Sequence, residues 1–161
     1  MKVLRTVLVG IVGAITMSAA MFLLRIAGIP VSFEALLGSL LGDPSNPTYW
    51  MAGLAMHVLF GIIVAFGYML TFEVVERSGL LMGAGLGLAH GLMAGLFMSG
   101  IPAMNPLAPN AQAPGPFLAH LSFGPVIFLA LHALYGAAVG LTYGHPIHEH
   151  GLTIHGNVVE R

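Results

Sequence analysis

Four long apolar stretches dominate the sequence, and each is long enough to cross the hydrocarbon core of a membrane. They run over residues 4–27, 49–75, 80–101 and 125–143. A crossing takes ~20 helical residues. Each stretch must be helical, because lipid offers no partner for an open backbone and four short segments cannot close a barrel. The sequence therefore predicts an all-α fold: residues 1–144 form an integral membrane four-helix bundle, and residues 145–161 form a cytoplasmic tail.

The composition agrees with membrane lipid as the surroundings of the chain. Charged residues make up 7% of the chain and hydrophobic residues 57%, whereas charged residues make up ~25% of a soluble domain. A formal net charge of −1 gives no basic surface for a nucleic acid. The chain contains no cysteine, which excludes disulfides and thiolate metal sites.

The positive charges predict the orientation of the chain. Short cytoplasmic loops of membrane proteins carry an excess of lysine and arginine. If both termini are cytoplasmic, Arg25 alone falls near the outer side. The residues that then share the inner side are Lys2, Arg5, Arg77 and Arg161. We therefore expect a bacterial inner-membrane protein with both termini inside. The first apolar run continues beyond a stretch that imitates a signal peptide, so we expect it to be retained as a helix.

The outer segments between the spans carry patterns of their own. Residues 31–41 are too short to span and have apolar residues at helical spacing, which predicts an interfacial helix lying on the membrane. Residues 102–116 are rich in proline and should be extended. Residues 117–123 favour a second short interfacial turn, after which Pro125 opens the last helix at its first position.

The second and fourth apolar stretches carry the same pattern of residues. In each, a histidine is followed by a glycine, a valine and a tyrosine at offsets of 4, 7 and 11, which places the side chains on one helix face. The two sets are His57, Gly61, Val64, Tyr68 and His132, Gly136, Val139, Tyr143. The pattern predicts two repeated helical hairpins, related by a pseudo-twofold axis along the membrane normal.

The repeat also predicts where its two histidines lie. In an up-down bundle, the second and fourth helices sit diagonally across the centre, and the shared face is the interior. We expect His57 and His132 to point inward at similar depth, in the outer half of the membrane.

Short motifs around these histidines resemble those of a known family. His-x-Leu-Phe-Gly begins at His57 and His-x-Leu-Tyr-Gly begins at His132, and Gly28-Ile29-Pro30 follows the first span. In a short four-span chain, these motifs resemble a family of small bacterial membrane proteins to which no activity is assigned. The resemblance covers residues 8–144. It implies the four-span topology and lends no chemistry.

Histidines at membrane depth are candidates for function, because burying ionisable groups in hydrocarbon is costly. One hypothesis is that His57 and His132 bind a haem b or another tetrapyrrole, such as a chlorophyll-type pigment, from opposite faces. Gly61 and Gly136, one turn after each histidine, would then leave room for the macrocycle. Arg25 would meet a propionate.

A metal ion is the second candidate ligand. His57, His90 and His132 would bind it, with Met56 or Met93 as soft ligands for copper. The tail contains a weaker metal-binding pattern, for which a solvated tail is the alternative interpretation. Its histidines are His145, His148 and His150.

The interpretation without a cofactor is that each neutral histidine hydrogen-bonds across the bundle and fixes the helix register. The leading functional hypothesis is then a non-catalytic accessory subunit or scaffold. It would pack through its glycine-rich faces as a homo-oligomer or against a larger membrane complex. The second hypothesis is a small cofactor carrier that binds haem, a pigment or a metal through His57 and His132. The third is a transporter.

Overall fold

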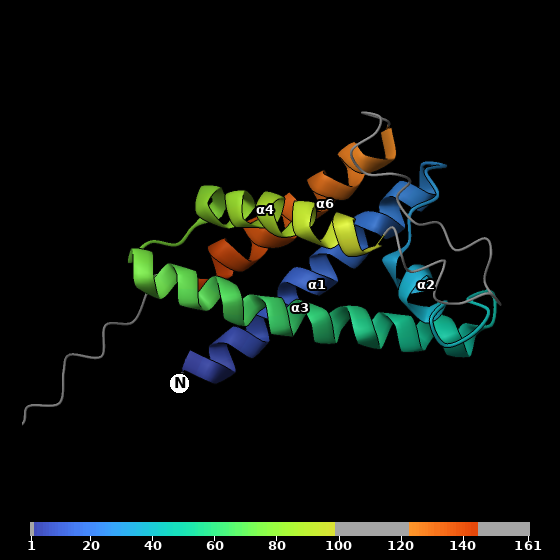
Figure 1. Ribbon diagram of the computed structural model, residues 1–161, viewed down its shortest axis with the longest axis horizontal. Coiled ribbons are helices and arrows are strands. Elements are labelled where there is room, and N and C mark those ends of the chain that lie inside the picture. The colour runs from blue at the N-terminus through green and yellow to red at the C-terminus, as the bar shows by residue number, and fades with distance from the viewer. Residues whose placement is uncertain (1, 99–122, 145–161) are drawn as a thin grey trace, which may run out of the picture.

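The computed structural model describes residues 2–98 and 123–144, and within these ranges it contains five helices and no strand. A short helix, α2, spans Phe33–Gly38 (Figure 1). The four long helices are α1 (Lys2–Ile26), α3 (Pro47–Val75), α4 (Leu80–Met98) and α6 (Phe123–Tyr143). All four are long and apolar enough to cross a membrane. The prediction of an all-α chain with four such helices is confirmed for this part of the sequence.

The long helices run in alternating directions. α1 and α4 run from left to right in Figure 1, and α3 and α6 return. α1 packs between α3 and α6, α4 packs on α6, and α2 packs on α3. Although α3 and α4 follow each other along the chain, they pack mainly on different helices. A space lined by side chains remains between them.

A tight turn connects α3 to α4 and fixes where α4 begins. Glu76 caps α3 in the left-handed region (φ 56°), and Gly79 has a φ of 112°, which favours glycine. The backbone N–H of Gly79 donates to the carbonyl of Gly140 in α6 over 3.1 Å. The start of α4 is therefore attached to the end of α6.

Glycines let α4 and α6 approach backbone to backbone. A Cβ added to Gly83 would overlap the carbonyl of Gly136, and one added to Gly87 would overlap the carbonyl of His132. At Gly136, an added Cβ would in turn overlap the carbonyl of Gly83. Small residues allow this close contact between membrane helices. The glycine-rich face of the third apolar stretch is thus used inside the chain.

The start of α1 lies beside the ends of α3 and α6. The Nζ atom of Lys2 is 3.1 Å from Oε2 of Glu73, and the Arg5 guanidinium lies 4.3 Å from the centre of the Tyr143 ring. The Tyr143 hydroxyl donates to Oε1 of Glu73 over 2.6 Å. The first residues of α1 and the last residues of α6 therefore share one end of the bundle.

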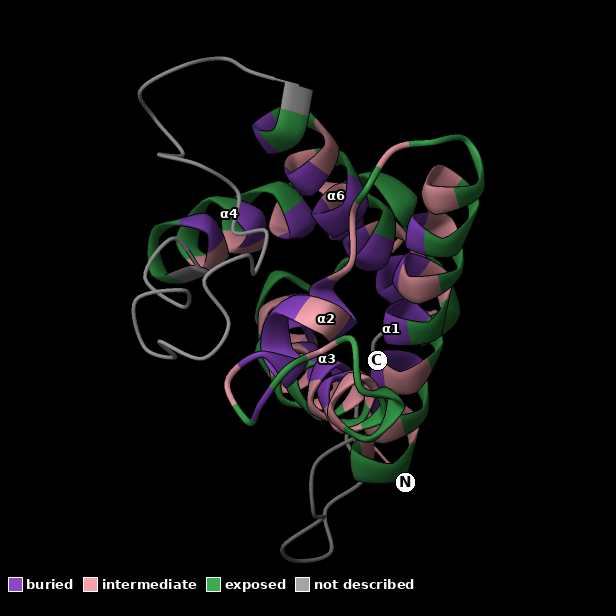
Figure 2. Cartoon of the chain, turned by 90° about the vertical axis from the view of Figure 1, so that its right-hand side faces the viewer, coloured by how far each residue is buried: buried purple, intermediate pink, exposed green. Residues whose placement is uncertain are grey.

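α2 is buried against α3, a contact that the expectation of an interfacial helix did not include. Phe33, Leu36 and Leu37 are almost completely covered, and Glu34 is buried too (Figure 2). Gly53 of α3 permits the contact, because a Cβ there would overlap the carbonyl of Glu34. The apolar spacing of the segment marks side chains that need burial. α3 supplies much of that burial, and Phe33 also meets Phe128 and His132 of α6.

The remaining expectations for the connecting segments have different outcomes. α6 begins at Phe123, so Pro125 lies within its first turn and not at its first position. The predictions for residues 102–122 lie outside the described residues. So do those for the tail, whose predicted metal ligands are His145, His148 and His150.

Candidate functional site

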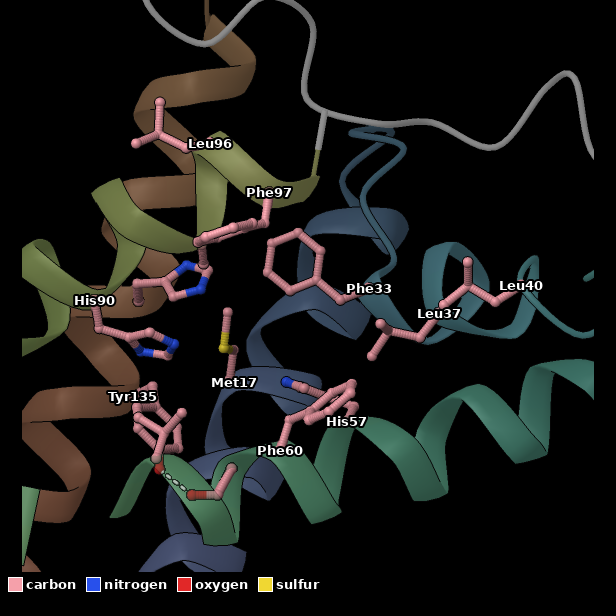
Figure 3. A pocket seen from close by; sticks show the side chains of 14 residues that line it. Met17, Phe33, Leu37, Leu40, His57, Phe60, His90, Leu96, Phe97 and Tyr135 are labelled. Carbon is pink, nitrogen blue, oxygen red and sulfur yellow. Dashed lines mark hydrogen bonds between the residues drawn. The ribbon is translucent and has the colours of Figure 1, made fainter. Parts of the chain in front are cut away.

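A partly open cavity of about 690 Å³ lies between α3 and α4, and all five described helices contribute to its wall. Phe60 of α3 and Phe97 of α4 line it and are 45% and 76% exposed, so the mouth lies between these two helices. The wall is mostly apolar. Among the described residues, its polar side chains are His57, His90 and Tyr135, which Figure 3 labels, and His132. No charged side chain among the described residues lines it.

His57 reaches the cavity from the buried face of α3, where Gly53, His57 and Gly61 follow one another at intervals of one turn. Its Nδ1 atom is 3.1 Å from the hydroxyl oxygen of Ser18 in α1. This contact joins α3 to α1. Such a bond across the bundle is what we expect of a histidine that binds no cofactor.

His132 reaches the same cavity from α6 and is also buried. Its Nδ1 atom donates to the carbonyl of Phe128, one turn earlier in the same helix, over 2.8 Å. The Phe128 ring lies 4.2 Å from the imidazole, measured between ring centres. Within the described ranges, His132 is therefore held by its own helix and makes no hydrogen bond across the bundle.

His90 joins the two predicted histidines from α4. Its ring centre is 4.9 Å from that of His132, and the two rings are nearly perpendicular. The Nδ1 atom of His90 and the hydroxyl oxygen of Tyr68 are buried and have no hydrogen-bond partner within residues 2–98 and 123–144. The ring centres of these two residues are 6.3 Å apart.

Phe33 of α2 stands against both predicted histidines. Its ring centre is 6.2 Å from that of His57 and 5.6 Å from that of His132. Phe33 would therefore lie against any ligand that both imidazoles contact.

The residues expected to assist a haem have other contacts. A Cβ at Gly61 would meet Ala14 and the carbonyl of Gly10 in α1, and the space at Gly136 is filled by α4. Both glycines serve helix packing. Arg25 lies 3.6 Å from a carboxylate oxygen of Glu34 and donates to a backbone carbonyl, so it is not held ready for a propionate.

The predicted metal ligands line one cavity without forming a metal-binding group. In the described part of the chain, no three histidine or acidic side chains gather closely enough to hold a metal ion. Met93 is exposed, and neither Met56 nor Met93 lines the cavity. The structure brings His57, His90 and His132 around a common space rather than around a common point.

Sequence reasoning missed several residues of the site, among them Tyr135 and Phe33. Tyr135, whose hydroxyl donates to the carbonyl of Gly61 over 2.5 Å, follows His132 within the repeated motif, so its position carried a signal. No sequence signal marked Phe33, because its position at the cavity depends on how α2 packs against the other helices. Comparison of the chain with protein-family models, curated proteins and solved structures gives no match.

Proposed function

We propose that the protein is an integral membrane protein with four transmembrane helices and both termini on the same side. Large apolar side chains are exposed on every long helix, among them Leu23, Val74, Leu81 and Val126. Lipid can cover these side chains. The shared end of α1 and α6 supports termini on one side. The distribution of lysine and arginine supports a bacterial inner membrane with that side cytoplasmic.

Within this membrane protein we propose a binding site for a neutral, lipid-soluble molecule, so that the protein acts as a small carrier. One observation carries the proposal: three histidines from three helices converge on one cavity that opens between α3 and α4, and no charged side chain within residues 2–98 and 123–144 lines it. Ligand sites are typically apolar cavities of ~300–1,000 Å³ with a few polar groups. Ionisable residues at membrane depth usually mark such a site.

The repeated-hairpin arrangement remains part of the proposal. Its support is that the histidine, glycine and tyrosine of both matched sets are buried. The contacts of matched residues differ, however. His57 meets Ser18 of α1, whereas His132 bonds within α6. Tyr68 has a buried hydroxyl in the interior, whereas Tyr143 bonds to Glu73.

The accessory-subunit hypothesis remains a prediction, with less support from the geometry. It relied on glycine-rich faces, and Gly83, Gly87 and Gly136 are occupied by contacts inside the chain. A homo-oligomer or a larger membrane complex would have to form through other surfaces. The transporter hypothesis also remains a prediction.

Filling the cavity tests the carrier proposal. Ala94 of α4 lines the cavity, and Ala94→Phe would place a ring in it. Ala89→Phe is the matched control, because Ala89 is an exposed residue of the same helix outside the cavity. Each protein is purified in mild detergent, extracted with organic solvent and analysed by mass spectrometry.

The unaltered protein and Ala89→Phe should retain the same lipid-soluble compound in a fixed ratio to protein, and Ala94→Phe should lose it. If all three proteins retain the same set of compounds in the same amounts, the cavity is not the binding site. Thermal unfolding of the three proteins separates loss of ligand from loss of fold.

A further inference from the structure

His132 presents a lone pair to the cavity. Its Nδ1 atom donates to the carbonyl of Phe128, and a carbonyl oxygen only accepts, so the proton of the neutral ring sits on Nδ1. The Nε2 atom is then the hydrogen-bond acceptor of the ring. Within residues 2–98 and 123–144, the bond to Phe128 is the one hydrogen bond that the imidazole makes.

His90 supplies the complementary group beside it. Its Nδ1 atom is buried, so Nε2 is the atom that it can offer to the cavity. The Tyr68 ring lies 6.3 Å from that of His90, between ring centres, and its hydroxyl is also buried without a partner in the described part of the chain. With its ring proton on Nε2, a neutral His90 is a hydrogen-bond donor to the cavity. An acceptor on His132 beside a donor on His90, with ring centres 4.9 Å apart, matches a hydroxyl group, which both donates and accepts.

We propose that the cavity binds an isoprenoid quinol, one phenolic hydroxyl of which donates to Nε2 of His132 and accepts from Nε2 of His90. This inference rests on the proposed function and names the ligand class. The oxidised form, a quinone, has no hydroxyl proton and leaves the His132 acceptor unpaired. The site therefore selects the reduced form.

The cavity wall agrees with a neutral aromatic head group. Phe33, Phe60 and Phe97 line it, and aromatic rings gain from edge-to-face contact with one another. No charged side chain of the described residues faces the space, which suits an uncharged ligand. The mouth between α3 and α4 lets an isoprenoid tail extend into surrounding lipid.

A haem suits the same wall less well. Its two carboxylates need cationic partners, and no lysine or arginine in the described ranges lines the cavity. Arg25, the cation nearest in sequence to α2, pairs with the buried Glu34. Haem binding is therefore treated as an outcome that would overturn the quinol proposal.

The test measures binding of a short-tailed quinol, its quinone and its dimethyl ether to the full chain in detergent, by anaerobic equilibrium dialysis. The quinol should bind about tenfold more tightly than either other compound, since only the quinol pairs the His132 acceptor. In His132→Phe this preference should vanish. If His132→Phe does not fold, the comparison with the dimethyl ether on the unaltered protein decides the question alone.

Each alternative gives a different result. Equal binding of quinol and quinone, or equal binding of a long-chain aliphatic alcohol, overturns the quinol proposal. A shift of the Soret band of added haem that His132→Phe removes also overturns it. In any of these cases, loss of binding in Ala94→Phe but not in Ala89→Phe leaves the carrier function standing. The two proposals can therefore fail separately.

Discussion

Tyr135 of α6 donates its hydroxyl hydrogen to the backbone carbonyl of Gly61 in α3, over 2.5 Å (Figure 3). α3 and α6 make few other direct contacts, since α1 packs on both of them, and a second hydrogen bond joins Tyr143 to Glu73 where both helices end. Tyr135 and Gly61 line the cavity. The Tyr135 hydrogen bond therefore links α3 to α6 where the cavity walls meet.

Removing this hydroxyl should loosen the contact between α3 and α6. We expect Tyr135→Phe to lower the free energy of unfolding by about 0.6 kcal/mol, the average for side-chain hydrogen bonds between membrane helices, and by no more than about 1.7 kcal/mol, the largest such value. The change is measured by reversible unfolding in mixed micelles. Tyr49→Phe, which removes a hydroxyl near the start of α3 and outside the cavity, is the matched control. Equal effects of the two variants would show that the bond to Gly61 contributes nothing.

The contact between α4 and α6 should tolerate no added methyl group. Gly83→Ala places a Cβ on the carbonyl of Gly136, so the helices must separate. Overpacking of this kind costs about 1–3 kcal/mol. Gly85→Ala is the matched control, because an added Cβ there meets no atom within 4 Å. Alanine favours a helix over glycine, so this control should unfold at the same temperature as the unaltered protein or higher. The unfolding temperatures of both variants are measured in detergent. Equal temperatures would contradict the close contact between Gly83 and Gly136.

The long helices and the inward histidines could be predicted from the sequence because their signals are local. Apolar runs of spanning length identify the helices, and offsets of three and two turns place His57 and Gly61 on the same face as Tyr68. That face is buried in α3. The same reasoning placed His132 inside. Such predictions need only the periodicity of a helix and the choice of a buried face.

The rest of the site depends on packing between segments that are distant in sequence. Phe33 meets both predicted histidines because Gly53 admits the backbone of α2, and no spacing rule links residues so far apart. Gly136 was assigned to a cofactor because it follows His132 by one turn. The neighbouring helix decides whether a glycine leaves space for a ligand or for a helix. The sequence of α6 alone does not say which helix packs beside Gly136.

Glu34 is a buried carboxylate that pairs with Arg25. Removing Arg25 should therefore lower the stability more than removing the charge of Glu34. The Glu34 side chain is 1% exposed and lies 3.6 Å from Arg25, and it also accepts from the Ser32 hydroxyl. Arg25→Leu leaves the charge buried and unpaired, which costs about 3–5 kcal/mol. Glu34→Gln should cost less, since it removes the buried charge and keeps a group that the Ser32 hydroxyl can bond to.

The double variant Arg25→Leu/Glu34→Leu separates charge from shape. It should recover at least half of the stability that Arg25→Leu loses, because no unpaired charge remains. Unfolding curves in mixed micelles give the three free energies. If the double variant is less stable than Arg25→Leu alone, the packing of α2 and not the ion pair accounts for the loss.

The last prediction concerns the shared end of α1, α3 and α6, where Glu73 bonds both to Lys2 and to the Tyr143 hydroxyl. Hydrogen bonds to a charged group are stronger than neutral ones, but the side chains of Lys2 and Glu73 are 30% and 22% exposed, so water weakens their attraction. A double-mutant cycle of Glu73→Gln and Tyr143→Phe should therefore give a coupling of about 1 kcal/mol. The cycle of Glu73→Gln with Lys2→Met should give less, and its coupling should fall as salt is added. A salt-independent Lys2 coupling larger than that of Tyr143 would mean that the ion pair, and not the tyrosine, holds α1 and α3 together at this end.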